Sequence, residues 1–253
     1  MATYKKKAGK KAKTSQANIE QGSTTAEVFN TLDETASKSE SFVEKNQNII
    51  LYGIVAVAVI ILGTIGYNKY IQEPKEAQAA DELAYPKVYF TEASTSNEAV
   101  DSLLVLGLEG ANGKYGFIDI ASVYSGTKAG NLANYYAGVS YLKLKNYESA
   151  IDYLSAFKSN DLLLEAESRS LIGDAFADIN QLDDALNYYE IAAQTKPNEA
   201  MTPLYLMKAG QTAMALEDFS KAEALFTEIK VTYPKSDLAS NIDMYINKAK
   251  YSK

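Results

Sequence analysis

The chain contains neither cysteine nor histidine among its 253 residues. Without cysteine it can form no disulfide framework and no thiolate zinc site. Without histidine it lacks the commonest general base and metal ligand, so a serine nucleophile would have no imidazole partner. We therefore predict that the protein is not an enzyme, has no catalytic residues and holds no metal or other cofactor.

Two short stretches resemble ligand-binding loops but lack the residues that such loops need. Gly113 and Lys114 in GANGKYG at 110–116 resemble the end of a phosphate loop. However, Leu108 stands five residues before Gly113, where the first glycine is needed, and Tyr115 stands in place of the magnesium-binding hydroxyl. Asp178 opens a stretch like a calcium loop, yet Asp183 stands at the turn glycine and Tyr189 at the bidentate glutamate. No small-molecule substrate is expected.

Charge is absent from Ile49 to Tyr67, which reads IILYGIVAVAVIILGTIGY. At helical rise these nineteen residues extend ~28 Å, close to the roughly 30 Å of a bilayer hydrocarbon core. A buried helix of a soluble protein normally keeps a polar face, which is missing here. With 48 residues before it, the run lies too far along the chain for a signal peptide, so we predict a membrane-spanning helix that persists.

The lysines around this span predict its orientation. Residues 1–48 carry eight lysines against six acidic residues, net +2, whereas residues 68–253 carry 17 basic against 26 acidic residues, net −9. Basic residues remain on the cytoplasmic side, so we expect the N-terminus there and an acidic exported part. The lysines before Thr14 suit anionic lipid or ribosomal RNA as well, but only Tyr4 is interleaved with them, and no nucleic-acid partner is expected.

Residues 131–236 contain one template three times. Glycines stand at 138, 173 and 210, at spacings of 35 and 37 residues, and alanines follow them at 150, 185 and 222. This spacing is close to the roughly 34-residue period of stacked helical hairpins, in which small residues let two helices approach. We predict an all-α protein in which Leu154, Tyr189 and Phe226 fill the space beside the glycines.

Five regions follow from these patterns. They are a basic cytoplasmic tail (1–48), the span (49–67), a linker helix with a degenerate capping repeat (68–130), three repeats (131–236) and a C-terminal capping helix (237–253). Residues 1–23 have few apolar side chains and are expected to be disordered. From Thr24 either a short juxtamembrane helix or a weakly helical linker fits, and the helix over 73–94 is predicted to break or restart near Pro86.

The repeats resemble the tetratricopeptide repeat, although Asn134 and Arg169 replace the bulky residue that is usual at the fourth position. The resemblance implies a tetratricopeptide-repeat α-solenoid that binds other proteins. The whole layout, with SGTKAGNLANYYAGVSYLKLKNYESAIDYL at 125–154, resembles the bacterial YfgM-like family of ancillary Sec translocon subunits.

That second resemblance implies a single-pass protein of the bacterial inner membrane with its repeats in the periplasm. The partners it implies are Sec channel subunits, exported polypeptides or periplasmic chaperones. The repeat domain is also similar to that of a cell-division coordinator of envelope synthesis, so an envelope-biogenesis scaffold is the alternative function.

In this repeat family the first helix of each pair lines a concave surface. Mapped onto this chain, the inward positions form a candidate protein-binding groove with an apolar first third, an acidic centre and an end that contains methionine. The residues are Leu132, Tyr135, Val139, Leu142, Lys143, Ser170, Asp174, Ala177, Asp178, Met207, Gln211 and Met214. Two readings stay open, because the apolar face of the last helix, 237–250, suits a cover for this groove equally well.

A second candidate surface lies in the span. Gly53, Ala56 and Gly63 form a face of small residues on which a neighbouring helix can pack. The strict motif of small residues four apart is missing, since Val57 and Tyr67 stand at those positions. We therefore favour ordinary exposure to lipid over a helix contact.

Overall fold

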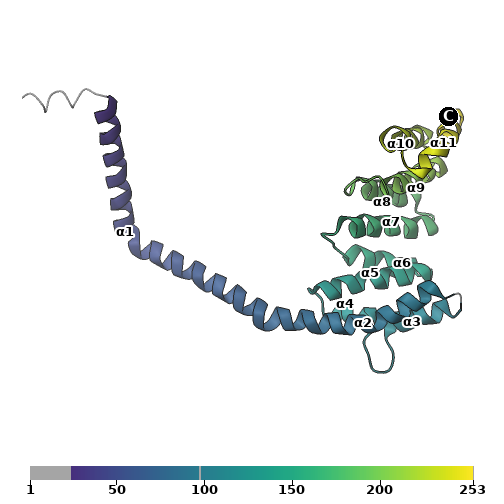
Figure 1. Ribbon diagram of the computed structural model, residues 1–253, viewed down its shortest axis with the longest axis horizontal. Coiled ribbons are helices and arrows are strands. Elements are labelled where there is room, and N and C mark those ends of the chain that lie inside the picture. The colour runs from purple at the N-terminus through teal and green to yellow at the C-terminus, as the bar shows by residue number, and fades with distance from the viewer. Residues whose placement is uncertain (1–23, 97, 253) are drawn as a thin grey trace, which may run out of the picture. The chain divides into compact units, whose positions relative to one another are not determined.

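The computed structural model describes residues 24–96 and 98–252, and every regular element in these ranges is a helix (Figure 1). The predicted disorder of residues 1–23 falls outside the described residues. Two compact units divide the chain between Tyr67 and Asn68. The predicted all-α class with a helical solenoid after an apolar N-terminal helix is confirmed.

The first unit consists, in its described part, of the helix α1 (Thr24–Tyr67). Residues from Thr24 to the predicted span belong to one continuous helix with it. The apolar side chains of the predicted span are exposed, including Ile54 at 61% and Leu62 at 68%. One helical stretch, Glu34–Thr95, contains a window that is long and apolar enough to cross a membrane, and none of that window is buried.

The second unit begins with four elements that we call the cap: η2 (Asn68–Gln72), α2 (Glu73–Thr95), α3 (Val100–Glu109) and α4 (Phe117–Val123). The helix α2 packs against α3, α4 and α5. Its buried face joins α5 (Lys128–Lys143) in one apolar cluster, which includes Leu83, Phe117 and Ala133. The cap is thus built from three α-helices rather than from a single helix pair.

The predicted break near Pro86 is wrong, because α2 continues through this residue to Thr95. Proline removes one hydrogen bond inside a helix and normally bends or ends it. Pro86 is buried, and its carbonyl oxygen lies 3.5 Å from where a Cβ on Gly107 of α3 would stand. Packing against α3 on this side, and against α4 and α5, holds α2 together where its own hydrogen bonding is interrupted.

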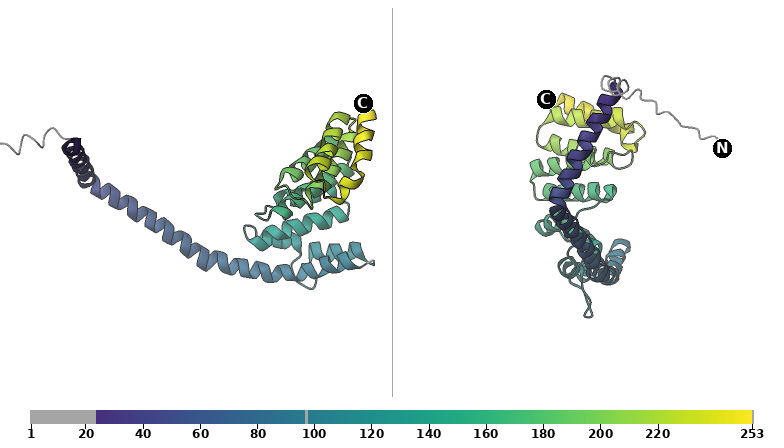
Figure 2. Two further views of the ribbon diagram at one scale, coloured as in Figure 1. Left: turned by 45° about the horizontal axis from the view of Figure 1, so that its top comes forward. Right: turned by 90° about the vertical axis from the view of Figure 1, so that its left-hand side faces the viewer.

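Three helical hairpins follow the cap. Hairpin 1 is α5 with α6 (Tyr147–Ala156), hairpin 2 is α7 (Leu162–Asp178) with α8 (Leu182–Gln194), and hairpin 3 is α9 (Thr202–Ala215) with α10 (Phe219–Thr232). Consecutive helices pack against one another from α4 to α11 (Ile242–Tyr251), which gives the stacked layers seen in Figure 2.

The repeated glycines lie where the two helices of each hairpin cross. A Cβ on Gly138 would stand 2.5 Å from Leu154, one on Gly173 2.7 Å from Tyr189, and one on Gly210 2.3 Å from Phe226. Real Cβ contacts do not become this short, so only glycine fits without a shift of its neighbour. The predicted pairing of each glycine with a large side chain of the second helix is confirmed.

Each hairpin also turns in the same way. Lys145, Asn180 and Glu217 have φ angles of 61°, 60° and 60° and stand at the same place between the two helices. Their spacings of 35 and 37 residues equal those of the glycines. The left-handed region is unfavourable for lysine and glutamate, which shows that the hairpin geometry, rather than local preference, decides the conformation there.

The chain ends with η3 (Asp237–Asn241) and α11. Ile242 and Ala249 of α11 are fully buried, and Tyr245 packs against Phe226 of α10 with the ring centroids 5.4 Å apart. The helix α11 therefore stacks on the second helix of hairpin 3, in the place that the first helix of a further hairpin would take.

Candidate functional site: a groove along α2

Two neighbouring cavities lie along the exposed side of α2. Their volumes are about 430 and 300 Å³, and Ala84 and Lys87 line both of them. The first is lined by α2 alone and the second also by the start of α5, including Leu132. We call this combined surface the α2 groove.

Small side chains on one side of α2 leave room for the groove. Ala80, Ala84, Thr91 and Thr95 are exposed, whereas Ala79, Leu83, Pro86 and Ala93 of the same helix are buried in the cap. The hydroxyls of Thr91 and Thr95 donate to backbone carbonyls of α2, so their methyl groups remain available to a ligand. The surface therefore suits a partner with apolar side chains.

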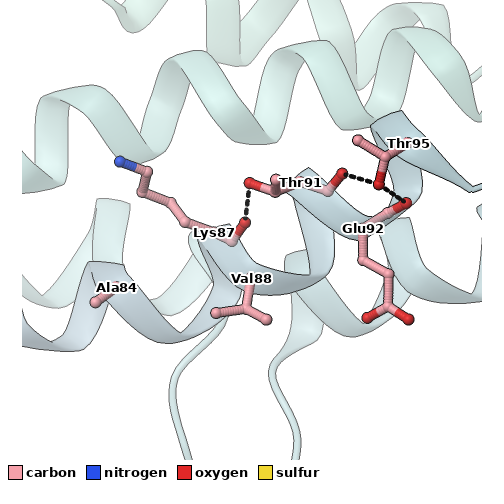
Figure 3. A pocket seen from close by; sticks show the side chains of 6 residues that line it. All are labelled: Ala84, Lys87, Val88, Thr91, Glu92 and Thr95. Atoms are coloured by element: carbon pink, nitrogen blue, oxygen red, sulfur yellow. Dashed lines mark hydrogen bonds between the residues drawn. The ribbon is translucent and has the colours of Figure 1, made fainter.

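Lys87 is one of two cations that line this groove, and the other, Lys128, comes from the start of α5. Figure 3 shows that Lys87 and Val88 leave α2 in different directions, with Glu92 on the side of Val88. The ammonium of Lys87 lies 5.5 Å from the ring centroid of Tyr136, a cation–π distance. Within 24–96 and 98–252, no carboxylate lies at ion-pair distance from it. A carboxylate of a partner is the ligand that would complete it.

The residues predicted for the concave groove are placed in different environments. Leu132 lines the α2 groove, and Val139, Ser170 and Met207 are buried, so these three offer a partner little surface. Lys143, Asp178 and Gln211 are exposed, and Tyr135, Leu142, Asp174, Ala177 and Met214 are half-buried. The last helix packs on α10, and the prediction that this surface binds a partner stays a prediction.

The acidic centre of that surface is partly neutralised. The ammonium of Lys208 lies 2.7 Å from the Asp174 carboxylate, and the hydroxyl of Tyr189 donates to the same carboxylate at 2.7 Å. Burial, followed by the charge of Asp174, raises the pKa of Tyr189 well above its usual value. Asp174 therefore holds α7, α8 and α9 together, which leaves it less available to a partner.

Glu167 of α7 has two tyrosine neighbours, Tyr135 of α5 and Tyr205 of α9. Burial and the neighbouring Glu167 carboxylate raise the pKa of Tyr135, and they raise the pKa of Tyr205 to about 12. The Tyr205 hydroxyl is buried and has no hydrogen-bond partner among the described residues. A buried hydroxyl without a partner destabilises the fold, so Tyr205 is a weak point of hairpin 3.

The small residues predicted as a helix-packing face are exposed in α1. A Cβ on Gly53 or Gly63 would meet nothing within 4 Å, and Ala56 beside them is exposed as well. These positions have room for a second helix or for lipid, and the choice between the two stays a prediction.

Sequence reasoning missed Ala84, Lys87 and Thr91 as residues of the α2 groove. The exposed side of α2 carries small residues at Ala77, Ala80 and Ala84, at the three- and four-residue spacing of a helix face. That spacing was a usable signal. It was hidden because the predicted break at Pro86 divided the face into two short pieces.

Comparison with known families supports the helical repeats. The model of the tetratricopeptide repeat matches residues 132–161, which run from the second turn of α5 to Asp161 before α7. This range covers hairpin 1 except for the first four residues of α5. The match, together with the stacked hairpins, shows a tetratricopeptide-type α-solenoid, a fold whose usual role is to bind proteins. No curated protein matches the chain.

Proposed function

We propose that this protein is a single-pass scaffold of the bacterial inner membrane, an ancillary subunit at the exit side of the Sec translocon. The observation that carries the proposal is one chain with both an apolar helix able to cross a membrane and a tetratricopeptide-type solenoid. The lysine asymmetry favours a cytoplasmic N-terminus and periplasmic repeats. Such a scaffold assists exported polypeptides or recruits periplasmic chaperones.

In this proposal the α2 groove receives a segment of the partner. Ala80, Ala84 and Thr91 allow close approach of an apolar helix or extended strand, and Lys87 receives an acidic group on it. The concave surface, with Lys143, Asp178 and Gln211 exposed, supplies further contacts. In both places the partner is a protein, so the proposal includes neither catalysis nor a cofactor.

Site-specific photocrosslinking in native membranes tests the position of the protein. A photoreactive residue at position 53 or 56 of the full chain should give adducts with Sec channel subunits. A matched residue at Lys248, which is exposed near the C-terminus, should not give them. Consistent absence of channel subunits from the adducts at 53 and 56 would remove the translocon assignment.

The groove is tested in the same chain by a photoreactive residue at position 84, with Val123 on α4 as an exposed control. We expect partner adducts from position 84 that decrease when Lys87 is changed to Glu. Equal adducts from both positions, or no effect of Lys87→Glu, would show that the partner binds elsewhere.

The alternative is a scaffold for envelope biogenesis or cell division whose span is merely an anchor. The exposed, loosely spaced small residues of α1 favour it, because the strict packing motif is missing. Replacement of residues 49–67 by an unrelated span decides between the two. If the protein with the unrelated span still works as a scaffold in the cell, the span is merely an anchor. If it inserts into the membrane normally but no longer works, the span makes a specific contact.

A further inference from the structure

A third cavity, of about 370 Å³, lies where α5 begins and hairpin 1 ends. Ser125 lines it from the turn before α5, Lys128 and Asn134 line it from α5, and Lys158 lines it from the segment after α6. It shares Lys128 with the α2 groove but is otherwise built from different residues. The lining offers two ammonium groups, the hydroxyl of Ser125 and the carboxamide of Asn134 as hydrogen-bond donors. Thr127 and Asn131 also line the cavity, but their side chains already donate to backbone carbonyls.

The cations around this cavity lack acidic partners. Within the described residues, no carboxylate lies at ion-pair distance from the ammonium of Lys128 or Lys158. A third ammonium, that of Lys75, lies 3.1 Å from the carbonyl oxygen of Ser125. Residues 68–253 carry a net charge of −9, so a group of three lysines at one place departs from the charge of the unit.

The nearby carboxylate is already engaged by the backbone. Glu76 of α2 accepts hydrogen bonds from the amides of Lys128 and Ala129, at 2.9 and 3.3 Å. It therefore fills the N-terminus of α5, where an external anion would otherwise bind. The positive groups that remain for a ligand are the lysine side chains, and the site does not depend on the helix terminus.

The length of chain that connects this cavity to the apolar helix is short. The carboxamide of Gln72 donates to the carbonyl of Gly126 at 3.0 Å, and Gln72 is five residues beyond Tyr67. Five residues extend at most about 18 Å, and about 8 Å when helical. The headgroup layer adds several ångströms on each side of a roughly 30 Å hydrocarbon core, so the helical length of about 8 Å is comparable to the depth of the headgroups.

The residues at this connection also suit the edge of a bilayer. Tyr70 and Ile71 are 78% and 54% exposed, immediately after the predicted span. Tyrosine is enriched at the membrane–water interface, where its ring sits among the headgroups. An apolar pair next to a lysine-lined cavity provides both contacts that an interfacial lipid needs.

We propose that the cavity at the start of α5 binds the phosphate of an anionic phospholipid headgroup. Lys128 and Lys158 neutralise the phosphate, and Ser125 and Asn134 donate hydrogen bonds to its oxygens. The bound lipid fixes this end of the solenoid at the membrane surface. The inference rests on the membrane anchor of the proposed function but not on the identity of the protein partner.

The test uses the full chain in nanodiscs that contain phosphatidylcholine and phosphatidylglycerol. Native mass spectrometry of the released protein should show retained phosphatidylglycerol. The double variant Lys128→Gln, Lys158→Gln should lower its apparent affinity by about 25-fold, because each lysine near an anionic surface contributes about fivefold. Neither substitution touches the hydrogen bonds that the two backbone amides make.

The control is Lys248→Gln, Lys250→Gln, which removes the same charge from exposed positions of α11. An equal loss of lipid in this control would overturn the proposal, since the effect would then come from net charge. Titration of the chain in detergent with inorganic phosphate, followed by ³¹P NMR, distinguishes the source. Phosphate that binds as tightly as the lipid would assign the site to the free anion instead.

Failure of this site and failure of the proposed function give different results. If the unchanged chain retains no phosphatidylglycerol but still gives channel adducts at positions 53 and 56, the lipid site is wrong and the translocon assignment stands. Retained lipid with no channel adducts leaves the cavity in place and removes the translocon assignment.

Discussion

The cap packs on α5 of hairpin 1, and the three hairpins pack on one another, but different contacts hold these two parts. Hairpins 1 to 3 repeat one apolar contact, a glycine against a large side chain, at Gly138, Gly173 and Gly210. The cap is joined to α5 by an apolar cluster and by the Glu76 carboxylate, which accepts from the amide of Lys128, while Gln72 and Lys75 donate to carbonyls of the turn before α5. The hairpins therefore owe their stability to a periodic pattern, and the cap depends on particular polar side chains.

The largest test of this comparison is Gly210→Val in hairpin 3. The new side chain would overlap the Phe226 ring, so we expect the free energy of unfolding to fall by about 3 kcal/mol. The matched control is Gln211→Val, since Gln211 is the next residue and is exposed. Its expected loss is less than about 0.7 kcal/mol, from helix propensity alone.

Urea unfolding of the full chain in detergent, followed by circular dichroism, measures both variants. Equal losses in Gly210→Val and Gln211→Val would show that the close helix crossing does not limit hairpin 3. The claim that the repeated glycine contacts stabilise the hairpins would then be wrong.

The polar half of the comparison is tested by Glu76→Ala. The amides of Lys128 and Ala129 would lose their acceptor, and we expect a loss of about 1 to 2 kcal/mol, as for other helix caps. Hydrogen exchange of these two amides should accelerate more than that of amides in α9. Glu73→Ala is the control, because Glu73 is exposed on the same helix. If the two amides exchange in Glu76→Ala as fast as in the unchanged chain, the Glu76 carboxylate does not hold the start of α5.

The hairpins also contain polar contacts, and two ion pairs test how much these contribute to stability. Asp174 and Lys208 join hairpins 2 and 3, and their side chains are each 29% exposed, whereas Lys230 and Asp243 form a similar pair at 51% and 66% exposure. A double-mutant cycle with Asp174→Asn and Lys208→Met should give a coupling of about 1 kcal/mol. The exposed pair should give less than about 0.5 kcal/mol. Equal coupling energies in the two pairs would show that burial does not strengthen the Asp174–Lys208 ion pair.

The smallest change is Tyr205→Phe. Because the Tyr205 hydroxyl is buried without a partner, its removal should leave stability unchanged or increase it by up to about 1 kcal/mol. A measurable loss of stability would show that the hydroxyl has a partner after all, for example a water molecule.

The pH dependence of stability gives a second measurement on this variant. The pKa of Tyr205 is raised to about 12 in the folded chain, so between pH 10 and 12 the unfolded chain has released a proton that the folded chain retains. Stability is therefore complete below pH 10 and falls by about 1.4 kcal/mol per pH unit and tyrosine above it. Tyr205→Phe should show a shallower fall. An unchanged slope would contradict the raised pKa.

The sequence allowed the hairpins to be predicted because their contacts recur. Glycine and alanine at fixed spacing identify the crossing points, and Leu154, Tyr189 and Phe226 identify what fills them. The apolar stretch from Ile49 likewise predicts a helix from composition alone. Periodic contacts leave a periodic trace, and this is what a single sequence shows.

The cap could not be predicted in the same way, because its contacts join residues that share no pattern. Nothing near Glu76 in the sequence indicates that its carboxylate meets the amide of Lys128. Pro86 argues for a break on local grounds, and the packing of α3, α4 and α5 against α2 overrides it. The α2 groove depends on this continuous helix, so one local error concealed Lys87 as a candidate.

The hydrogen bond between Glu76 and Lys128 also sets an order of events during synthesis. Each hairpin joins segments within about one repeat of each other, so it can close soon after it is made. Glu76 must wait for a residue 52 positions later. At about 5 to 20 residues per second, that delay is roughly 3 to 10 s. For this interval the Glu76 carboxylate has no amide of α5 from which to accept, so the cap is finished only after α5 begins, although hairpins 2 and 3 are made later still.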